Sequence, residues 1–287
     1  MYTSKILPAD NTQWLTECWR MNIHLLHLPN KHIYQNKLTT GKVEDYQTSM
    51  CPFDISMWQP LIQIFKDNTE LWNCSGLLDI LQDLFNPLYN ILILRLLDQV
   101  NADDERNEME LFGLLAYCIY TCTLTEYQEY FVDQLFLQKV AHNDRRVLLD
   151  SILSQYTALP STLLTKTIDK SQGLERDGTM FSYTRYNTNH QNSNMFDVKK
   201  LNVATTRSKN KIIVTVNTIM ENQFHAWNTP DTERGWEYIQ SIIHDLRDET
   251  KIIQRYAADI KYVEWTMIKQ YFKKPTINSD SDNIELL

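Results

Sequence analysis

The chain has 287 residues, of which 43% are hydrophobic and 22% are charged, the proportions of an ordinary globular protein. Its formal net charge of -8 at pH 7 excludes a domain that holds nucleic acid through a generally basic surface, because such domains carry an excess of Lys and Arg. Any nucleic-acid contact is therefore expected in a local groove or on a partner domain.

The first predicted elements in chain order are an entry segment, residues 1–42, and a Trp- and Leu-rich stretch, residues 43–89. We interpret the second stretch as a mainly helical insertion. A buried strand is predicted at residues 90–97 (NILILRLL), because the run is continuously apolar. The polar residues 101–107 (NADDERN) are predicted to form a turn, and residues 108–122 a helix.

Strands and helices then alternate along the sequence. Strands are predicted at residues 134–141, 163–168, 179–184 and 211–216, and helices at residues 145–155 and 198–207. Such alternation is typical of an α/β fold with a parallel sheet and helices on its faces, so we expect one core over residues 90–218. Residues 219–275 are expected to form C-terminal helices, two amphipathic ones among them, and the polar residues 276–287 a disordered tail.

The five cysteines form no CxxC pair and have no histidine at finger spacing, so we expect core residues in a reducing compartment and no metal site. The longest apolar run, residues 87–98, is shorter than the roughly 18 to 20 residues that cross a bilayer. The first residues have no basic stretch followed by an apolar one, which indicates no secretory signal. We expect no membrane partner.

Residues 201–209 (LNVATTRSK) end a predicted helix just before the strand at residues 211–216. Phosphoryl transfer builds negative charge on the γ-phosphate oxygens, and an arginine presented by a neighbouring domain stabilises that charge. A helix end backed by a strand can fix Arg207 for this role. The alternative is an amphipathic helix on which Arg207 is merely solvated.

Residues 167–177 (TIDKSQGLERD) form a second candidate segment, about thirty residues earlier. Gly173 lies between two strands, where glycine lets backbone approach a ligand closely. The carboxylate of Glu175 can accept hydrogen bonds from sugar hydroxyls, and the hydroxyl of Thr167 can donate to a phosphate. The alternative is an ordinary polar loop.

Together these segments resemble motifs V and VI of superfamily 1 helicases, T-x-D-x-x-Q-G-x-E-x-D followed by N-V-A-[LI]-T-R-A-[KR]. Upstream, residues 15–22 (LTECWRMN) and residues 28–41 resemble the segment that opens the second motor domain of these enzymes. Asn107 and Glu110 fall where the family has N-x-x-E-A, and residues 140–146 (VAHNDRR) resemble motif IV. The LPN-x-x-x-Y run favours the helicase/nuclease branch that trims Okazaki flaps. The alternative is the RNA helicase of nonsense-mediated decay.

The resemblance implies a RecA-like second motor domain and several residue roles at an ATP site. Trp19 would stack on the nucleotide base. Arg20 and Arg207 would act as catalytic arginines that approach the γ-phosphate. Glu175 would contact the ribose, and Gly173 would allow close approach of the nucleotide.

The resemblance also implies that Asn143, Thr167 and Gln172 contact nucleic acid. Single-stranded DNA is the expected partner, with RNA possible, and the nucleus is the expected location, with the cytoplasm as the alternative. Departures from the family pattern include Cys18 in place of Gln and Ser208 in place of Ala, which suggest a diverged copy.

The sequence contains no P-loop of the form G-x-x-x-x-G-K-[ST], since Gly41-Lys42 is followed by Val43. The acidic run Asp103–Glu105 lies after the Trp-Arg-Met segment, whereas the family's Walker B motif lies before it, so we interpret the run as a turn. ATP and Mg²⁺ are therefore expected to bind only with a first motor domain, in cis or in trans. The alternative is an inactive helicase-like paralogue that serves as a nucleic-acid or protein binding module.

Overall fold

A computed structural model describes part of the chain. The described residues are 16–41, 83, 86, 88–97, 102–122, 136–140, 143–155, 165–184, 196–218 and 230–256. The expected tail at residues 276–287 and all but four residues of the expected insertion at residues 43–89 lie outside them.

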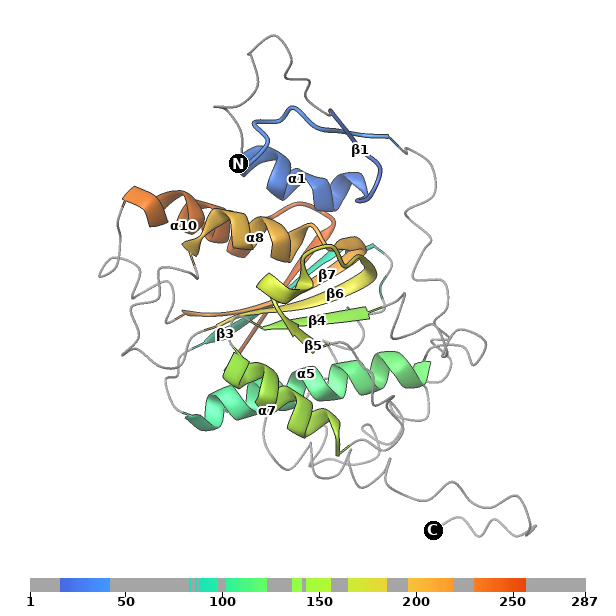
Figure 1. Ribbon diagram of the computed structural model, residues 1–287, viewed down its shortest axis with the longest axis vertical. Helices are drawn as coiled ribbons and strands as arrows, with labels where there is room; N and C mark the ends of the chain where they lie inside the picture. Colours follow the sequence, from blue (N-terminus) through green and yellow to red (C-terminus); the bar gives the residue numbers. More distant parts are fainter. Residues whose placement is uncertain are drawn as a thin grey trace, which may run out of the picture.

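In the described part of the chain, six parallel strands form one sheet in the order β5-β4-β6-β7-β3-β8 (Figure 1). The strands are β3 (Ile91–Leu97), β4 (Phe136–Val140), β5 (Thr165–Thr167), β6 (Arg176–Tyr183), β7 (Ser208–Asn217) and β8 (Thr250–Tyr256). A central strand of a parallel sheet is covered on both faces, which explains why β3 is almost continuously apolar in sequence. The predicted parallel α/β sheet is confirmed.

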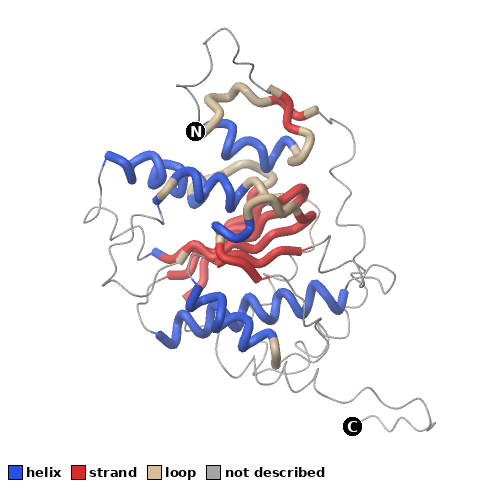
Figure 2. Tube along the Cα trace, viewed as in Figure 1, coloured by secondary structure: helices blue, strands red, loops and turns tan. Residues whose placement is uncertain are grey.

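Helices cover both faces of the sheet (Figures 1 and 2). One face carries α1 (Ile23–His32), α8 (Val198–Thr205) and α10 (Pro230–Ile243), and the other carries α5 (Ala102–Cys122) and α7 (Asn143–Leu153). This is the RecA-like arrangement expected from the sequence. None of the described helices is long and apolar enough to cross a membrane.

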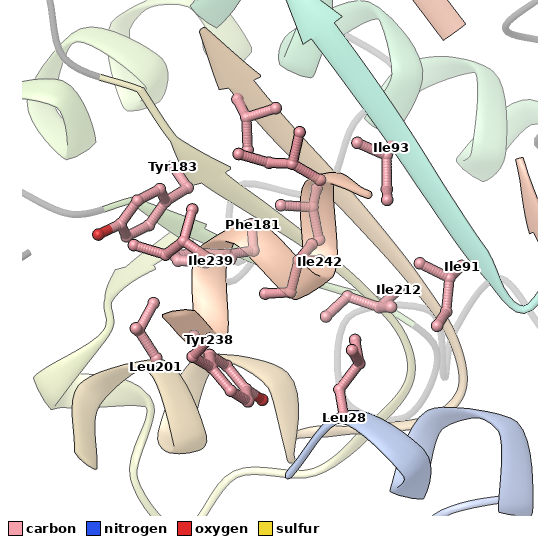
Figure 3. Close-up of a cluster of buried hydrophobic side chains, with 14 of the residues drawn as sticks. Leu28, Ile91, Ile93, Phe181, Tyr183, Leu201, Ile212, Tyr238, Ile239 and Ile242 are labelled. Atoms are coloured by element: carbon pink, nitrogen blue, oxygen red, sulfur yellow. The ribbon is translucent and has the colours of Figure 1, made fainter. Parts of the chain in front are cut away.

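Among the described residues, an apolar cluster joins the sheet to the layer of α1, α8 and α10 (Figure 3). Alternate residues of β3, Ile91 and Ile93, lie in this cluster because successive side chains of a strand point to opposite faces. Tyr238 of α10 and Leu201 of α8 are fully buried against them, and Leu28 brings α1 into the same core. The entry segment is therefore packed on the sheet, although much of the sequence separates it from β3.

Two expectations were wrong. Residues 250–256 form the edge strand β8 and not a second C-terminal helix, and Ile91 of β3 pairs with Thr250. The pairing supplies hydrogen bonds to an edge of β3 that would otherwise stay open, which outweighs the local helical pattern. Residues 102–107, expected to be a turn, form the first turns of α5, so the acidic run Asp103–Glu105 is helical.

Candidate functional site

Glu175 and Arg207 come together because each directly precedes one of two paired strands. β6 begins at Arg176 and β7 at Ser208, and these two residues are partners in the parallel register. The backbone N–H of Arg176 donates to the carbonyl oxygen of Arg207 at 3.0 Å. Both candidate residues therefore lie at the amino-terminal edge of the sheet.

The entry segment brings Arg20 to the same edge. Its side chain forms an ion pair with the carboxylate of Glu175. The two side chains are 38% and 34% exposed, so a ligand from solvent can reach both partners. Arg20 immediately precedes the turn that leads into α1, whose amino terminus is capped by Asn22.

The guanidinium of Arg207 is half-buried and held by its own helix end. Its Nε donates to the carbonyl oxygen of Val203 at 3.3 Å, and its Nη2 donates to Oγ1 of Thr206 at 3.0 Å. Burial and the neighbouring charge of Arg20 lower the pKa of Arg207, whereas Glu175 acts in the opposite direction. Two guanidinium groups around one carboxylate leave an excess of positive charge, which suits an anionic ligand such as a phosphate.

Trp19 directly precedes Arg20, and its side chain is 59% exposed. The indole lies directly over Gly41, where a Cβ atom would overlap the ring. Gly41 is fixed by its backbone N–H, which donates to the carbonyl oxygen of Cys18 at 3.1 Å, next to the short parallel pair of β1 (Glu17–Cys18) and β2 (Thr39–Thr40). A flat ligand could stack on the free face of Trp19.

The structure adds Tyr34 and Asn202, which the sequence did not single out as site residues. The side-chain N–H of Asn202 donates to the phenolic oxygen of Tyr34 at 3.0 Å and so ties the segment after α1 to α8. Tyr34 is the tyrosine of the LPN-x-x-x-Y run, so the resemblance pointed to this residue. Its contact with Asn202 could not be predicted from the sequence.

Gly173 lies in the loop between the short helix η4 (Asp169–Ser171) and β6. Its φ of +87° is a conformation that favours glycine, and a Cβ atom there would have no neighbour within 4 Å. The positive φ explains why a glycine is found at this position, and the free space around the Cβ position leaves room for a ligand. Gln172 beside it is also exposed.

Asn143 and Thr167 lie at the opposite edge of the sheet from the arginines. Thr167 ends β5 and is paired with Val140, the last residue of β4, and Asn143 begins α7 just after β4. Asn143 is exposed, although its Oδ1 accepts a hydrogen bond of 3.0 Å from Arg146. Arg20, Glu175 and Arg207 thus form one group, and Asn143 and Thr167, two of the residues predicted to bind nucleic acid, lie at the other end of the strands.

Arg145, expected within motif IV, is buried in an ion-pair network and not at a surface. Its Nη2 donates to the carboxylate of Glu108 at 2.7 Å. The same carboxylate accepts hydrogen bonds from hydroxyls of β6, β7 and the residue after β6, namely Ser182, Thr215 and Thr184. Burial by itself raises the pKa of Glu108, but Arg145 and these hydroxyls outweigh it and hold that pKa below its ordinary value.

No three of the described His, Cys, Asp and Glu residues lie together as a group that could hold a metal ion. The site is therefore described by its arginines, its carboxylate and its aromatic face. These groups can bind an anion, accept hydrogen bonds from hydroxyls and stack on a ring, which are the three parts of a nucleotide.

A family model described as an AAA domain matches residues 3–219 of the chain. No curated protein matches the sequence. Among solved structures, the chain is similar to the C-terminal part of the Fun30 ATPase domain, with 13% sequence identity and a TM-score of 0.21. The match covers 67% of this chain and 62% of that one, and a likeness with so low a TM-score shows neither fold nor function.

Proposed function

The chain belongs to the AAA domain family, within the helicase-like P-loop superfamily, and on that premise we propose that it is the second motor domain of an ATP-dependent DNA helicase. The single observation that supports this function best is the grouping of Arg20, Glu175 and Arg207 at one edge of the sheet. The finer proposal is a helicase/nuclease of DNA replication and repair that acts in the nucleus.

In this proposal the site binds the base, the ribose and the γ-phosphate of ATP from one side of the nucleotide. The ribose hydroxyls donate to Glu175, which separates the carboxylate from Arg20. The released guanidinium of Arg20 and that of Arg207 then face the γ-phosphate, where they stabilise the charge that develops during hydrolysis. Trp19 stacks on the base.

The other side of ATP would be held by a first motor domain, in cis or in trans. Its P-loop would bind the phosphates, and Mg²⁺ would be bound between those phosphates and the side chains of that domain. The residues of this chain fit the remaining part of the site, because they supply cationic and hydroxyl-accepting groups. We expect no hydrolysis by the chain alone.

Single-stranded DNA would pass the opposite edge of the sheet, near Asn143 and Thr167, with Gln172 on the loop between the two edges. Backbone phosphates can accept hydrogen bonds from the side chains of these residues. Such contacts read little sequence, and RNA remains a second possible ligand.

ATP hydrolysis with and without a first motor domain tests the proposal. The purified 287-residue chain is compared with the same chain fused behind the first motor domain of a superfamily 1 helicase, each with single-stranded DNA or RNA. We expect hydrolysis by the fusion alone, and a loss of kcat of about 1,000-fold or more in its Arg207→Ala variant. Arg234→Ala, at an exposed position of α10, is the control.

DNA-stimulated hydrolysis by the chain alone that disappears in Arg207→Ala would overturn the need for a separate first domain. An inactive fusion that still binds single-stranded DNA would favour the alternative, an inactive binding module. Stimulation by RNA and not by DNA would favour the RNA helicase.

A further inference from the structure

Asn22 joins the segment that carries Arg20 to the strand that follows Arg207. Its backbone N–H donates to the carbonyl oxygen of Lys209 at 3.1 Å, and its side-chain N–H donates to the carbonyl oxygen of Asn210 at 3.2 Å. Its side-chain oxygen accepts from the backbone N–H of Leu25 at 2.9 Å and so caps α1. One carboxamide therefore serves both a helix cap and a link to β7.

The hydrogen bond from Asn22 to Asn210 is buried, and its acceptor binds a second side chain as well. Asn22 is 2% exposed, and the carbonyl oxygen of Asn210 also accepts a hydrogen bond of 3.0 Å from the side chain of Asn90, just before β3. Buried amide groups are costly to leave without a partner, so the carboxamide of Asn22 has one favoured position. Asn90 reaches the same carbonyl from the sheet and not from the entry segment.

The position of this link decides where Arg20 lies. Arg20 is two residues before Asn22, and Arg207 is three residues before Asn210. Over so few residues the backbone reaches at most roughly 7 to 11 Å, so a shift of Asn22 against β7 moves one guanidinium relative to the other. Misplacement by about 1 Å of groups that act on a reacting phosphate can cost 100-fold in rate.

We propose that Asn22 is a positioning residue whose carboxamide, bound to the carbonyl oxygen of Asn210, sets the spacing between Arg20 and Arg207. The part of this proposal that concerns catalysis rests on the proposed function. The part that concerns the placement of Arg20 rests on the contacts of Asn22 and is tested without ATP.

Two substitutions separate the cap from the link. Asn22→Ser keeps a side-chain oxygen that caps a helix but loses the N–H that reaches Asn210, and Asn22→Ala loses both. Asn90→Ser is the matched control, because it removes the other donor to the same carbonyl oxygen. If Asn22→Ser does not fold, Asn22→Asp keeps the volume and the cap and removes the same donor.

The first readout is the solvent exchange of the Nε–H of Arg20, measured by nuclear magnetic resonance on the full chain and assigned through Arg20→Lys. We expect the ion pair with Glu175 to slow this exchange in the wild-type chain. We expect Asn22→Ser and Asn22→Ala to raise the rate roughly fivefold, the loss that corresponds to one hydrogen bond, and Asn90→Ser to leave it within about twofold. The melting temperature should fall further in Asn22→Ala than in Asn22→Ser.

An unchanged exchange rate in Asn22→Ser overturns the proposal, and so does an equal rise in Asn90→Ser, which would indicate general loosening. In the fused motor, we expect Asn22→Ser to lower kcat at least tenfold while KM for ATP stays within about twofold. A fusion without activity would overturn the proposed function, but it would not affect the conclusion that the exchange measurement gives about the placement of Arg20. A normal kcat with altered exchange would overturn the catalytic part.

Discussion

The guanidinium of Arg145 donates a hydrogen bond of 2.7 Å to the carboxylate of Glu108, and both side chains are buried on the face of the sheet opposite α8 and α10. Arg145→Met should therefore lower the free energy of unfolding by about 3 to 5 kcal/mol, because it leaves a buried carboxylate without its cation. Denaturation by urea measures the change.

The neighbouring Arg146 offers a matched control. Its ion pair with Asp150 spans 2.5 Å on the surface of α7, and both side chains are partly exposed. Arg146→Met should cost less than about 1 kcal/mol. Equal losses in the two variants would show that the burial of Arg145 does not govern its contribution.

Lys211 makes the stability of the chain depend on pH. Burial lowers its pKa from 10.5 to about 7, although the nearby carboxylate of Asp83 opposes the shift. Above pH 7 the unfolded chain binds this proton more strongly than the folded chain, so the free energy of unfolding rises with pH, by up to about 1.4 kcal/mol per pH unit. Lys211→Met should remove this rise.

Urea denaturation at several pH values from 7 to about 9 measures the slope, a range that ends about one unit below the pKa of tyrosines in the unfolded chain. Lys209→Met, two residues earlier on β7, is the control and should keep the wild-type slope. The same slope in the wild-type chain and in Lys211→Met would contradict the assignment.

The sheet and the closeness of Glu175 to Arg207 could be predicted because their signals are local. The apolar run of β3 and the alternation of β7 mark buried strands, and Glu175 and Arg207 become neighbours as soon as their following strands are placed side by side. Motif order then added Arg20. None of these steps needs the position of a distant side chain.

The remaining features depend on contacts between residues far apart in the sequence. Asn22 meets Asn210, and Glu108 meets Arg145, and no local pattern pairs them. The fate of residues 250–256 depends on the open edge of β3 and not on their own helical periodicity. The strands can therefore be predicted from local sequence, whereas the contacts that hold the candidate site in place are found only from the structure.

There is room for a side chain at Gly173, but the backbone conformation of this residue is unfavourable for any residue other than glycine. Its φ of +87° strains residues with a Cβ atom, whereas no atom beyond the two adjoining residues lies within 4 Å of the place where that Cβ would be. Gly173→Ala should lower the free energy of unfolding by about 1 to 2 kcal/mol, and Gly173→Asn by less, because asparagine enters this region more readily. Urea denaturation of the two variants measures the difference, and equal stability of Gly173→Ala and the wild type would contradict it.

Glu175 should affect nucleotide binding far more than stability. Its ion pair with Arg20 is about one-third exposed on each side, so Glu175→Ala should change the free energy of unfolding by less than about 1 kcal/mol. In the fused motor, the same change should raise KM for ATP about tenfold or more, since a hydrogen bond from a hydroxyl to a charged carboxylate is lost.

The nucleotide itself supplies the control for Glu175. A dideoxy analogue of ATP lacks both ribose hydroxyls, so the carboxylate has nothing to accept from it, and the wild-type fusion and Glu175→Ala should then show the same KM. A tenfold difference that persists with the analogue would mean that Glu175 acts through Arg20 and not on the ribose. In that case the carboxylate would serve to hold the guanidinium in place, and Glu175→Gln, which keeps a hydrogen-bond acceptor for Arg20, should restore part of the loss.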